Sequence, residues 1–186
     1  MLLMTKHIEP GTARRAKGFT LIELIVVIVI LGILLALALP KMMNMGASAR
    51  IASIRSLAGS VKSALGLVKV LTTMSGPGTQ GAQADITWVG LTDGTQVRVW
   101  SGYPDRWCDG IGLTQQGMTV PSGGCYLSAA AVSHETYTFY GYGNSAIPGG
   151  DAGWRIESAP TPIQCAVRYT YNGTGIPLVQ AYTSGC

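Results

Sequence analysis

The sequence predicts an α+β fold in which one long N-terminal helix packs against a head of antiparallel β-strands. Residues 19–39 are apolar with almost no interruption, and residues 41–74 repeat apolar residues at helical spacing. Residues 75–186 alternate short β-prone runs with turns rich in Gly, Asn and Asp. The expected segments are a basic leader at 1–18, an apolar helix at 19–40, an amphipathic helix at 41–74, and a β-sheet head at 75–186.

The leader is short and basic, and it carries most of the net positive charge of the chain. The whole chain is +4 at pH 7, whereas residues 1–18 hold Lys6, Arg14, Arg15 and Lys17 against Glu9. The rest is therefore nearly neutral, and the basic balance does not indicate nucleic acid. Because positive charge stays on the cytoplasmic side of a membrane, we expect the residues after Pro40 to lie on the opposite side.

The apolar stretch is long enough to cross a membrane and contains one acid. As a helix, Phe19–Leu39 would extend about 31 Å, and no charged residue occurs between Leu24 and Leu39. The acid is Glu23, and a charge placed in the membrane costs about 2.5–3.5 kcal/mol. Such a carboxylate usually has a partner and a function.

Three other interpretations of this stretch are open. A secretory signal could be cut after Ala36-Leu37-Ala38, or the helix could be an anchor that is never cut. It could also be the core helix of a soluble protein. The acid inside the apolar run and the amphipathic pattern that continues past the signal site make the signal less well supported.

The amphipathic half is expected to continue the same helix. Gly32 and Pro40 weaken that helix, and Pro40 removes one hydrogen bond, so a kink or local opening is expected there. Arg55, Lys62 and Lys69 are spaced by seven along one flank. We interpret them as a solvated face, with contact to acids of a neighbouring subunit as the alternative. The expected apolar face is Ile51, Ile54, Leu57, Ala58, Val61, Ala64, Leu65, Val68 and Leu71.

The head is expected to form one antiparallel sheet of about four to five strands on this helix. Asp93-Gly94 and the run 172–175 mark two hairpins, and a four-residue turn at 172–175 would place Cys165 opposite Tyr182. A short helix is predicted within 110–118. The predicted strands are 86–91, 95–100, 137–140, 154–157, 164–171 and 176–183.

The four cysteines all lie in the head, on the side expected to be exported. An even number of cysteines in an oxidising compartment predicts two disulfides, and four cysteines allow three connectivities. The four are Cys108, Cys125, Cys165 and Cys186.

No motif for catalysis or cofactor binding is present, so we expect no enzyme, cofactor or metal site. His134-Glu135 is an isolated pair and is interpreted as a solvated loop. Asp105 and Asp109 could hold calcium, but the glycine and ligand spacing of a loop site is missing.

The run from Lys17-Gly18-Phe19 to Glu23, followed by uninterrupted apolar residues, resembles the type IV pilin family. The resemblance implies cleavage between Gly18 and Phe19 by a prepilin peptidase, which also methylates Phe19. It implies that Glu23 pairs with the terminal amine of a neighbouring subunit, and that the segment between Gly32 and Pro40 can melt in the fibre. It further implies the disulfides Cys165–Cys186 and Cys108–Cys125.

Further blocks are similar to the mannose-sensitive haemagglutinin pilins: the residues after Pro40, the run 56–65, Gly102-Tyr103-Pro104, the run 165–169 and the final cysteine. This similarity implies the major subunit of a surface fibre used for attachment, with the chain itself, the peptidase and an inner-membrane assembly machinery as partners. The chain would lie in the inner membrane first and in an extracellular pilus afterwards. The alternatives are a minor pilin, a type II secretion pseudopilin or a DNA-uptake pilin. The head has only four arginines and seven acids, so no nucleic acid is expected as a partner.

Overall fold

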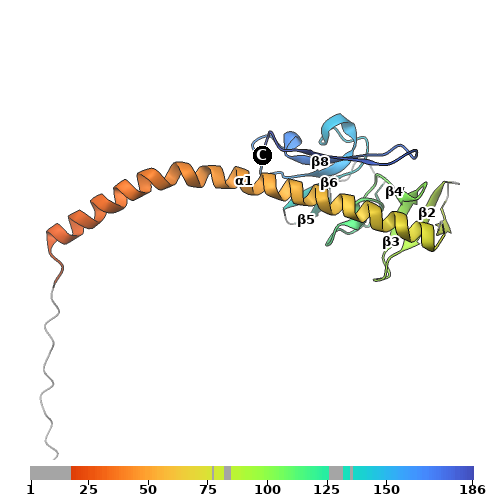
Figure 1. Ribbon diagram of the computed structural model, residues 1–186, viewed down its shortest axis with the longest axis horizontal. Coiled ribbons are helices and arrows are strands. Elements are labelled where there is room, and N and C mark those ends of the chain that lie inside the picture. The colour runs from red at the N-terminus through yellow and green to blue at the C-terminus, as the bar shows by residue number, and fades with distance from the viewer. Residues whose placement is uncertain (1–17, 77, 82–84, 126–131, 135) are drawn as a thin grey trace, which may run out of the picture. The chain divides into compact units, whose positions relative to one another are not determined.

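The computed structural model describes residues 18–76, 78–81, 85–125, 132–134 and 136–186 (Figure 1). The chain divides into two compact units, with the boundary between Met43 and Asn44. The secondary structure begins with one helix, α1, which spans Leu21–Met74 and contains 54 residues. The remaining described elements are nine strands and three short 3-10 helices, all of them in the second unit.

The first part of α1 exposes its side chains all around the helix. Every described side chain between Leu21 and Leu39 is exposed in the single chain. Leu24–Leu39 offers only apolar residues, so no side is polar enough to distinguish one face from another. The backbone stays helical through Pro40, and the predicted single long helix is confirmed.

The second part of α1 is amphipathic and buries one face against the head. Its fully or nearly buried residues are Ile54, Leu57, Ala58, Val61, Leu65 and Val68. These positions recur every three or four residues, which is the spacing of one helical face. The helix ends where the amide of Ser75 donates to the carbonyl of Leu71 at 2.8 Å, and Gly76 follows with φ 79, a left-handed conformation that suits glycine.

The head contains two antiparallel sheets rather than the single sheet predicted. The first sheet has the order β1-β2-β3-β4 and the second the order β5-β6-β7-β8-β9. The strands of the first sheet are β1 Thr79–Gln80, β2 Ile86–Gly90, β3 Gln96–Trp100 and β4 Tyr103–Pro104. Those of the second are β5 Val132–His134, β6 Tyr137–Tyr140, β7 Ala152–Arg155, β8 Ala166–Thr170 and β9 Leu178–Tyr182.

Both predicted hairpins form, but the second has a longer loop than expected. Val89 lies opposite Val97 in the β2–β3 hairpin, as the Asp93-Gly94 turn predicts. In the β8–β9 hairpin Thr170 pairs with Leu178, so the loop runs from 171 to 177, and Tyr182 faces Ala166 instead of Cys165. The loop packs on the first sheet: a side chain at position 173 would collide with the Trp100 ring, so only glycine fits there.

Two smaller predictions were wrong in extent. The helix expected within 110–118 is a single 3-10 turn, η1 at Gly112–Thr114, because Gly112 and Gly117 limit longer helix formation. The strand expected at 154–157 begins and ends two residues earlier, at Ala152–Arg155. The other 3-10 turns are η2 at Pro148–Gly150 and η3 at Pro162–Gln164, each beginning at a proline.

Each sheet packs on its own stretch of α1, and this produces two hydrophobic clusters. The larger cluster joins α1 from Ile54 to Leu65 with the five-stranded sheet, with Trp154 and Phe139 at its centre. The smaller cluster joins Val68 to the four-stranded sheet. Figure 1 shows β5, β6 and β8 beside the middle of α1 and β2 to β4 beside its last turns.

Candidate functional site

The start of α1 is closed by three reciprocal hydrogen bonds between Thr20 and Glu23. The Glu23 carboxylate accepts from the Thr20 amide at 2.9 Å and from the Thr20 hydroxyl at 2.8 Å. In return the Glu23 amide donates to the Thr20 hydroxyl oxygen at 3.3 Å. This is a capping box, in which a Thr and a Glu three residues apart satisfy free amides at a helix start. The carboxylate is therefore held at the first turn, in a fixed direction.

The predicted processing residues lie directly before this capped turn. Gly18 and Phe19 precede the helix and lie outside regular secondary structure, and Phe19 is 80% exposed. The basic residues of the leader, 1–17, lie outside the described residues. The structure thus places Phe19, Thr20 and Glu23 within one short exposed segment.

Beyond this turn α1 presents an apolar surface that water cannot solvate well. Leu37 is 72% exposed and Ile33 is 60% exposed. A methyl group at Gly32 would meet no atom of the chain within 4 Å, so the single chain gives no packing reason for this glycine. Two stretches of α1 are long and apolar enough to cross a membrane, Leu21–Leu39 and Met45–Met74. The second is one-third buried by the head.

The head contains two disulfides, and their pairing is Cys108–Cys125 and Cys165–Cys186. All four cysteines are buried, and no described cysteine is free. The pairing is the one that the family resemblance implies. It closes one loop around η1 and ties the end of the described chain to the start of β8.

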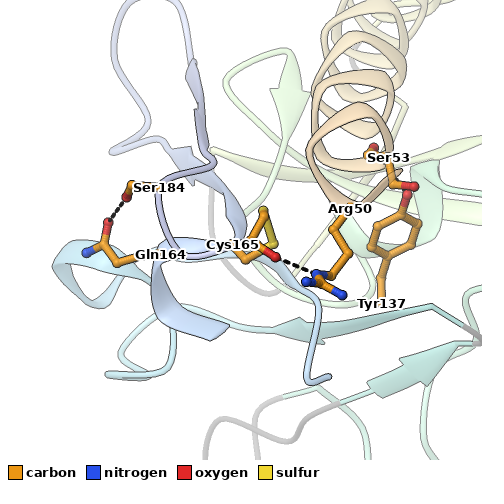
Figure 2. The surroundings of a disulfide bond; sticks show 7 residues. Arg50, Ser53, Tyr137, Gln164, Cys165 and Ser184 are labelled. Carbon is orange, nitrogen blue, oxygen red and sulfur yellow. Dashed lines mark hydrogen bonds between the residues drawn. A yellow bond between two sulfur atoms is a disulfide. The ribbon is translucent and has the colours of Figure 1, made fainter. Parts of the chain in front are cut away.

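The second disulfide is also bound to α1 (Figure 2). The Arg50 Nε donates to the carbonyl oxygen of Cys186 at 2.5 Å. One turn further along the helix, the Tyr137 hydroxyl donates to the carbonyl of Ser53 at 3.2 Å. These contacts fasten β6 and the C-terminal disulfide to the same end of the amphipathic helix.

The two acids considered for calcium are ion-paired with an arginine instead. Arg98 Nη2 lies 3.0 Å from Asp105 Oδ2, and Arg98 Nη1 lies 4.0 Å from Asp109 Oδ2. All three residues are buried. Burial raises the pKa of both carboxyls, and Arg98 offsets part of that effect. Among the described residues no group of three or more His, Cys, Asp or Glu could hold a metal ion.

The other head arginines are also engaged with neighbouring groups. Arg155 pairs with Glu157 at 2.8 Å, and Arg168 pairs with Asp151 at 2.6 Å. The guanidinium of Arg106 lies 3.4 Å from the centre of the Tyr142 ring. A row of free cations that could follow a nucleic-acid backbone is therefore absent from the described part of the head.

The three basic residues spaced by seven along α1, Arg55, Lys62 and Lys69, do not share one environment. Arg55 and Lys62 are exposed, as a solvated face would be. Lys69 is half-buried, with its Nζ 4.7 Å from the centre of the Tyr103 ring. His134, which was predicted to lie in a solvated loop, instead ends β5 and lies opposite Tyr137 of β6. Glu135 lies outside the described residues.

The capping box is the feature of this site that the sequence analysis missed. Its signal was present, because Thr20-Leu21-Ile22-Glu23 has the spacing of a capping box before an apolar run. The Arg98 ion pairs were also missed. They join β3 to the loop at 105–109, and no local pattern indicates such a contact.

An exposed apolar helix with one acid in its first turn, joined to a disulfide-bonded β head, defines a class of helix-anchored structural proteins. Residues 13–39 match the family model described as the prokaryotic N-terminal methylation motif. The chain is 48% identical over 56 residues to the type IV narrow pilus major component PilA5 of Thermus thermophilus, and the match covers 30% of this chain and 48% of that protein. No solved structure matches the chain.

Two further relatives are similar to this chain. It is 31% identical over 135 residues to the type II secretion system core protein G of Klebsiella michiganensis, with 73% of this chain and 88% of that protein covered. It is 36% identical over 80 residues to the type IV major fimbrial protein FimA of Dichelobacter nodosus, with 42% and 47% covered. The chain thus spans about half of the two pilus proteins and most of protein G.

The chain belongs to the type IV pilin family. The fold agrees with this assignment, since a long N-terminal helix with an apolar first part packs on antiparallel sheets that carry two disulfides. Its relatives are components of pili and of a secretion system, and the chain, like them, is a structural protein and not an enzyme.

Proposed function

We propose that this protein is the major subunit of a type IV pilus of the mannose-sensitive haemagglutinin kind, which polymerises through α1 into surface fibres for attachment. The observation that carries the proposal is the position of Glu23. It is the one acid in an apolar helix that is exposed all around, at the first turn after a basic leader. Such a surface needs lipid or other helices around it, and such an acid needs a cation.

The first step of the proposed pathway is processing at the membrane. A prepilin peptidase cuts between Gly18 and Phe19 and methylates the new amine of Phe19. The exposure of both residues supports this step, and so does the match of 13–39 to the methylation motif. The leader would then be residues 1–18 and the anchor residues 19–40.

In the second step the subunit leaves the inner membrane and joins the fibre. The Glu23 carboxylate of the incoming subunit pairs with the Phe19 amine of a neighbouring subunit, so that both charges are satisfied in an apolar core. The capping box supports this role because it already orients the carboxylate at the helix start. The assembly machinery of the inner membrane would supply the work.

We also propose that the segment from Gly32 to Pro40 melts when subunits pack in the fibre. Gly32 and Pro40 are both poor helix formers, with a helix penalty of about 1 and 3 kcal/mol relative to alanine. Amide hydrogen exchange of this segment should be faster in fibres than in membrane-bound subunits. Equal protection in the two states would contradict the proposal.

Mass spectrometry of fibres sheared from the cell surface tests the main proposal. This chain should be the most abundant protein, its N-terminal peptide should begin at Phe19 with one added methyl group, and both disulfides should be intact. A peptide that begins at Leu39 would instead indicate ordinary secretory processing. A low abundance beside another pilin would identify a minor subunit.

The second candidate function is a core subunit of a type II secretion system. It is favoured by one observation, the match to protein G that covers 88% of that protein. Deletion of the gene separates the two candidates. Loss of surface fibres with normal protein secretion supports the pilus, whereas retained secreted enzymes in the periplasm support the secretion system.

A further inference from the structure

The last turns of α1 and the turn between β2 and β3 form an apolar groove on the head. The groove holds about 450 Å³, and its apolar walls come from the helix and from Leu91. Leu67 and Val70 line it and are 67% and 53% exposed, which is unusual for large apolar side chains on a polar face. Among the residues that line the groove are Leu67, Val70, Leu71, Leu91 and Asp93.

A second exposed apolar feature lies on the loop that joins β8 to β9. Ile176 is 82% exposed and Leu178 is 53% exposed, on either side of a buried proline. The loop is held in place from within, because the Asn172 side chain accepts from the Thr174 amide at 3.2 Å and from its hydroxyl at 2.9 Å. We call Ile176 and Leu178 the apolar knob.

The groove and the knob carry opposite charges at their edges. Asp93 lines the groove and is exposed, with its carboxylate oriented by the Thr95 amide at 2.9 Å. Arg106 lies beside the knob's loop, with its Nη1 3.5 Å from the Tyr171 carbonyl and its guanidinium 5.3 Å from the centre of the Trp100 ring. The loop that carries the knob therefore has a cation at its start, and the groove has an anion in its lining, so the two surfaces have complementary charge.

Both features lie at the same level along α1 but on opposite flanks. The knob's loop packs on Trp100, and the turn that follows Trp100 reaches α1, where the Thr72 hydroxyl donates to the Gly102 carbonyl at 3.2 Å. The groove uses Leu67 and Leu71, at the same level. The same turn also contacts Lys69, whose Nζ lies 4.7 Å from the centre of the Tyr103 ring. Since each residue turns a helix by about 100°, Lys69 points about 160° away from Leu67. Figure 1 shows the β8–β9 hairpin and the β2–β3 turn on opposite sides of α1 in that view.

We propose that the apolar knob of one copy docks in the groove of the next copy, with Arg106 of the first facing Asp93 of the second. This inference rests on the proposed function, because it requires that copies lie side by side in a fibre. The knob and the groove are different surfaces, so the contact is heterologous and can repeat without closing. Two copies related in this way leave one knob and one groove free for further copies.

Disulfide crosslinking within fibres tests the contact directly. The variant that combines Ile176→Cys with Leu67→Cys should give, after mild oxidation by dissolved oxygen and a copper catalyst, a ladder of covalent multimers on a non-reducing gel. Each single variant should give none. A matched control combines Ile176→Cys with Arg55→Cys. Arg55 is exposed on the same helix but lies about 18 Å from Leu67, toward the N-terminus.

A charge placed on the knob tests its importance for assembly. Ile176→Asp should lower the yield of sheared fibres at least about tenfold, because an apolar side chain is no longer buried in the contact. The amount of processed, disulfide-bonded subunit in the membrane should not change. Val120→Asp is the control, because Val120 is 43% exposed on the head but belongs to neither surface.

The outcomes separate this inference from the proposed function. Fibres of the double cysteine variant without a ladder would overturn the inference and leave the pilus assignment intact. A dimer from Ile176→Cys alone, or a ladder equally strong in the Arg55 control, would also overturn it. If parent cells carry no fibres that contain this chain, the proposed function is wrong and the inference falls with it.

Discussion

Glu23 has two separable properties, its charge and its hydrogen bonds to Thr20. The charge is needed if the carboxylate pairs with the amine of a neighbouring subunit. The hydrogen bonds close the first turn of the subunit's own helix. The two properties can be removed one at a time, because glutamine also completes a capping box but carries no charge.

We predict that Glu23→Gln and Glu23→Ala are both processed and present in the membrane at normal levels, yet give few or no fibres. Thr20→Val should lose the cap, which contributes about 1 kcal/mol to the helix, and still build fibres. Immunoblots of membranes and counts of sheared fibres measure both effects.

Two results would contradict the charge-pairing role of Glu23. Glu23→Gln could build as many fibres as the parent, in which case capping alone matters. The alanine variant could also accumulate with its leader still attached, in which case the acid serves recognition by the peptidase.

The buried carboxyls beside Arg98 make a pH-dependent contribution to the stability of the head. Burial raises the pKa of Asp109 above its ordinary value of 3.8. An acid with a higher pKa in the folded chain contributes its full stability below the ordinary value and loses it as the pH rises through the folded value. Asn at this position cannot titrate.

We therefore expect the stability of Asp109→Asn relative to the parent to rise as the pH increases above about 4. Urea unfolding of the full chain in detergent, followed by tryptophan fluorescence, measures this difference. Glu157→Gln is a control of opposite sign, because the hydrogen bond from Arg155 lowers the pKa of Glu157. A difference that does not vary with pH for Asp109→Asn would show that its carboxyl keeps an ordinary pKa.

At the scale of elements, α1 could be predicted well because each of its halves has a strong pattern. The apolar run predicted the first half of the helix. The helical spacing of apolar residues from Ile54 to Val68 predicted the buried face of the second half. The strands were found where alternation was clean. The two-residue strands β1 and β4 and the three-residue strand β5 were missed, because two or three residues are too few to show a period.

The disulfides connect elements that local structure does not hold together. Replacing both cysteines of either pair with serine should lower the free energy of unfolding by about 3 kcal/mol, as expected for loops of 17 and 21 residues. The Cys165–Cys186 variant should lose more, because Arg50 of α1 binds the Cys186 carbonyl. Urea midpoints of the full chain measure both losses.

If the Cys108–Cys125 variant lost more stability than the Cys165–Cys186 variant, the loop around η1, and not the C-terminal disulfide, would limit the stability of the head. The matched control is Ser184→Ala, next to the second disulfide. Its exposed side chain donates to Gln164 at 3.2 Å, and its loss should have little effect.

At the scale of the whole molecule, the number of sheets could not be predicted from the sequence. Strand patterns indicate where the longer strands lie, but the assignment of a strand to a sheet depends on contacts far along the chain. Here the loop after β4 turns inward, and Asp105 and Asp109 pair with Arg98 on β3 instead of continuing the first sheet.

The candidate site could be predicted only where a local pattern of residues marked it. Glu23 stood out because a charge in an apolar run is costly, and Thr20 was overlooked although its spacing was visible. The knob and the groove had no local signal at all. Ile176 belongs to a clean strand pattern, and only the longer loop of the folded hairpin leaves it exposed.

If the chain is the pilus subunit proposed above, the exposed first part of α1 has one more consequence for its exchange between membrane and fibre. Lipid tails and neighbouring apolar helices are nearly equivalent surroundings for Leu24–Leu39, so exchange between them changes the hydrophobic free energy little. Addition and removal of a subunit would then be nearly balanced, and a modest energy input could drive either direction. A shortened fibre could return its subunits to the bilayer intact, and the cell could use the same molecules again without new synthesis.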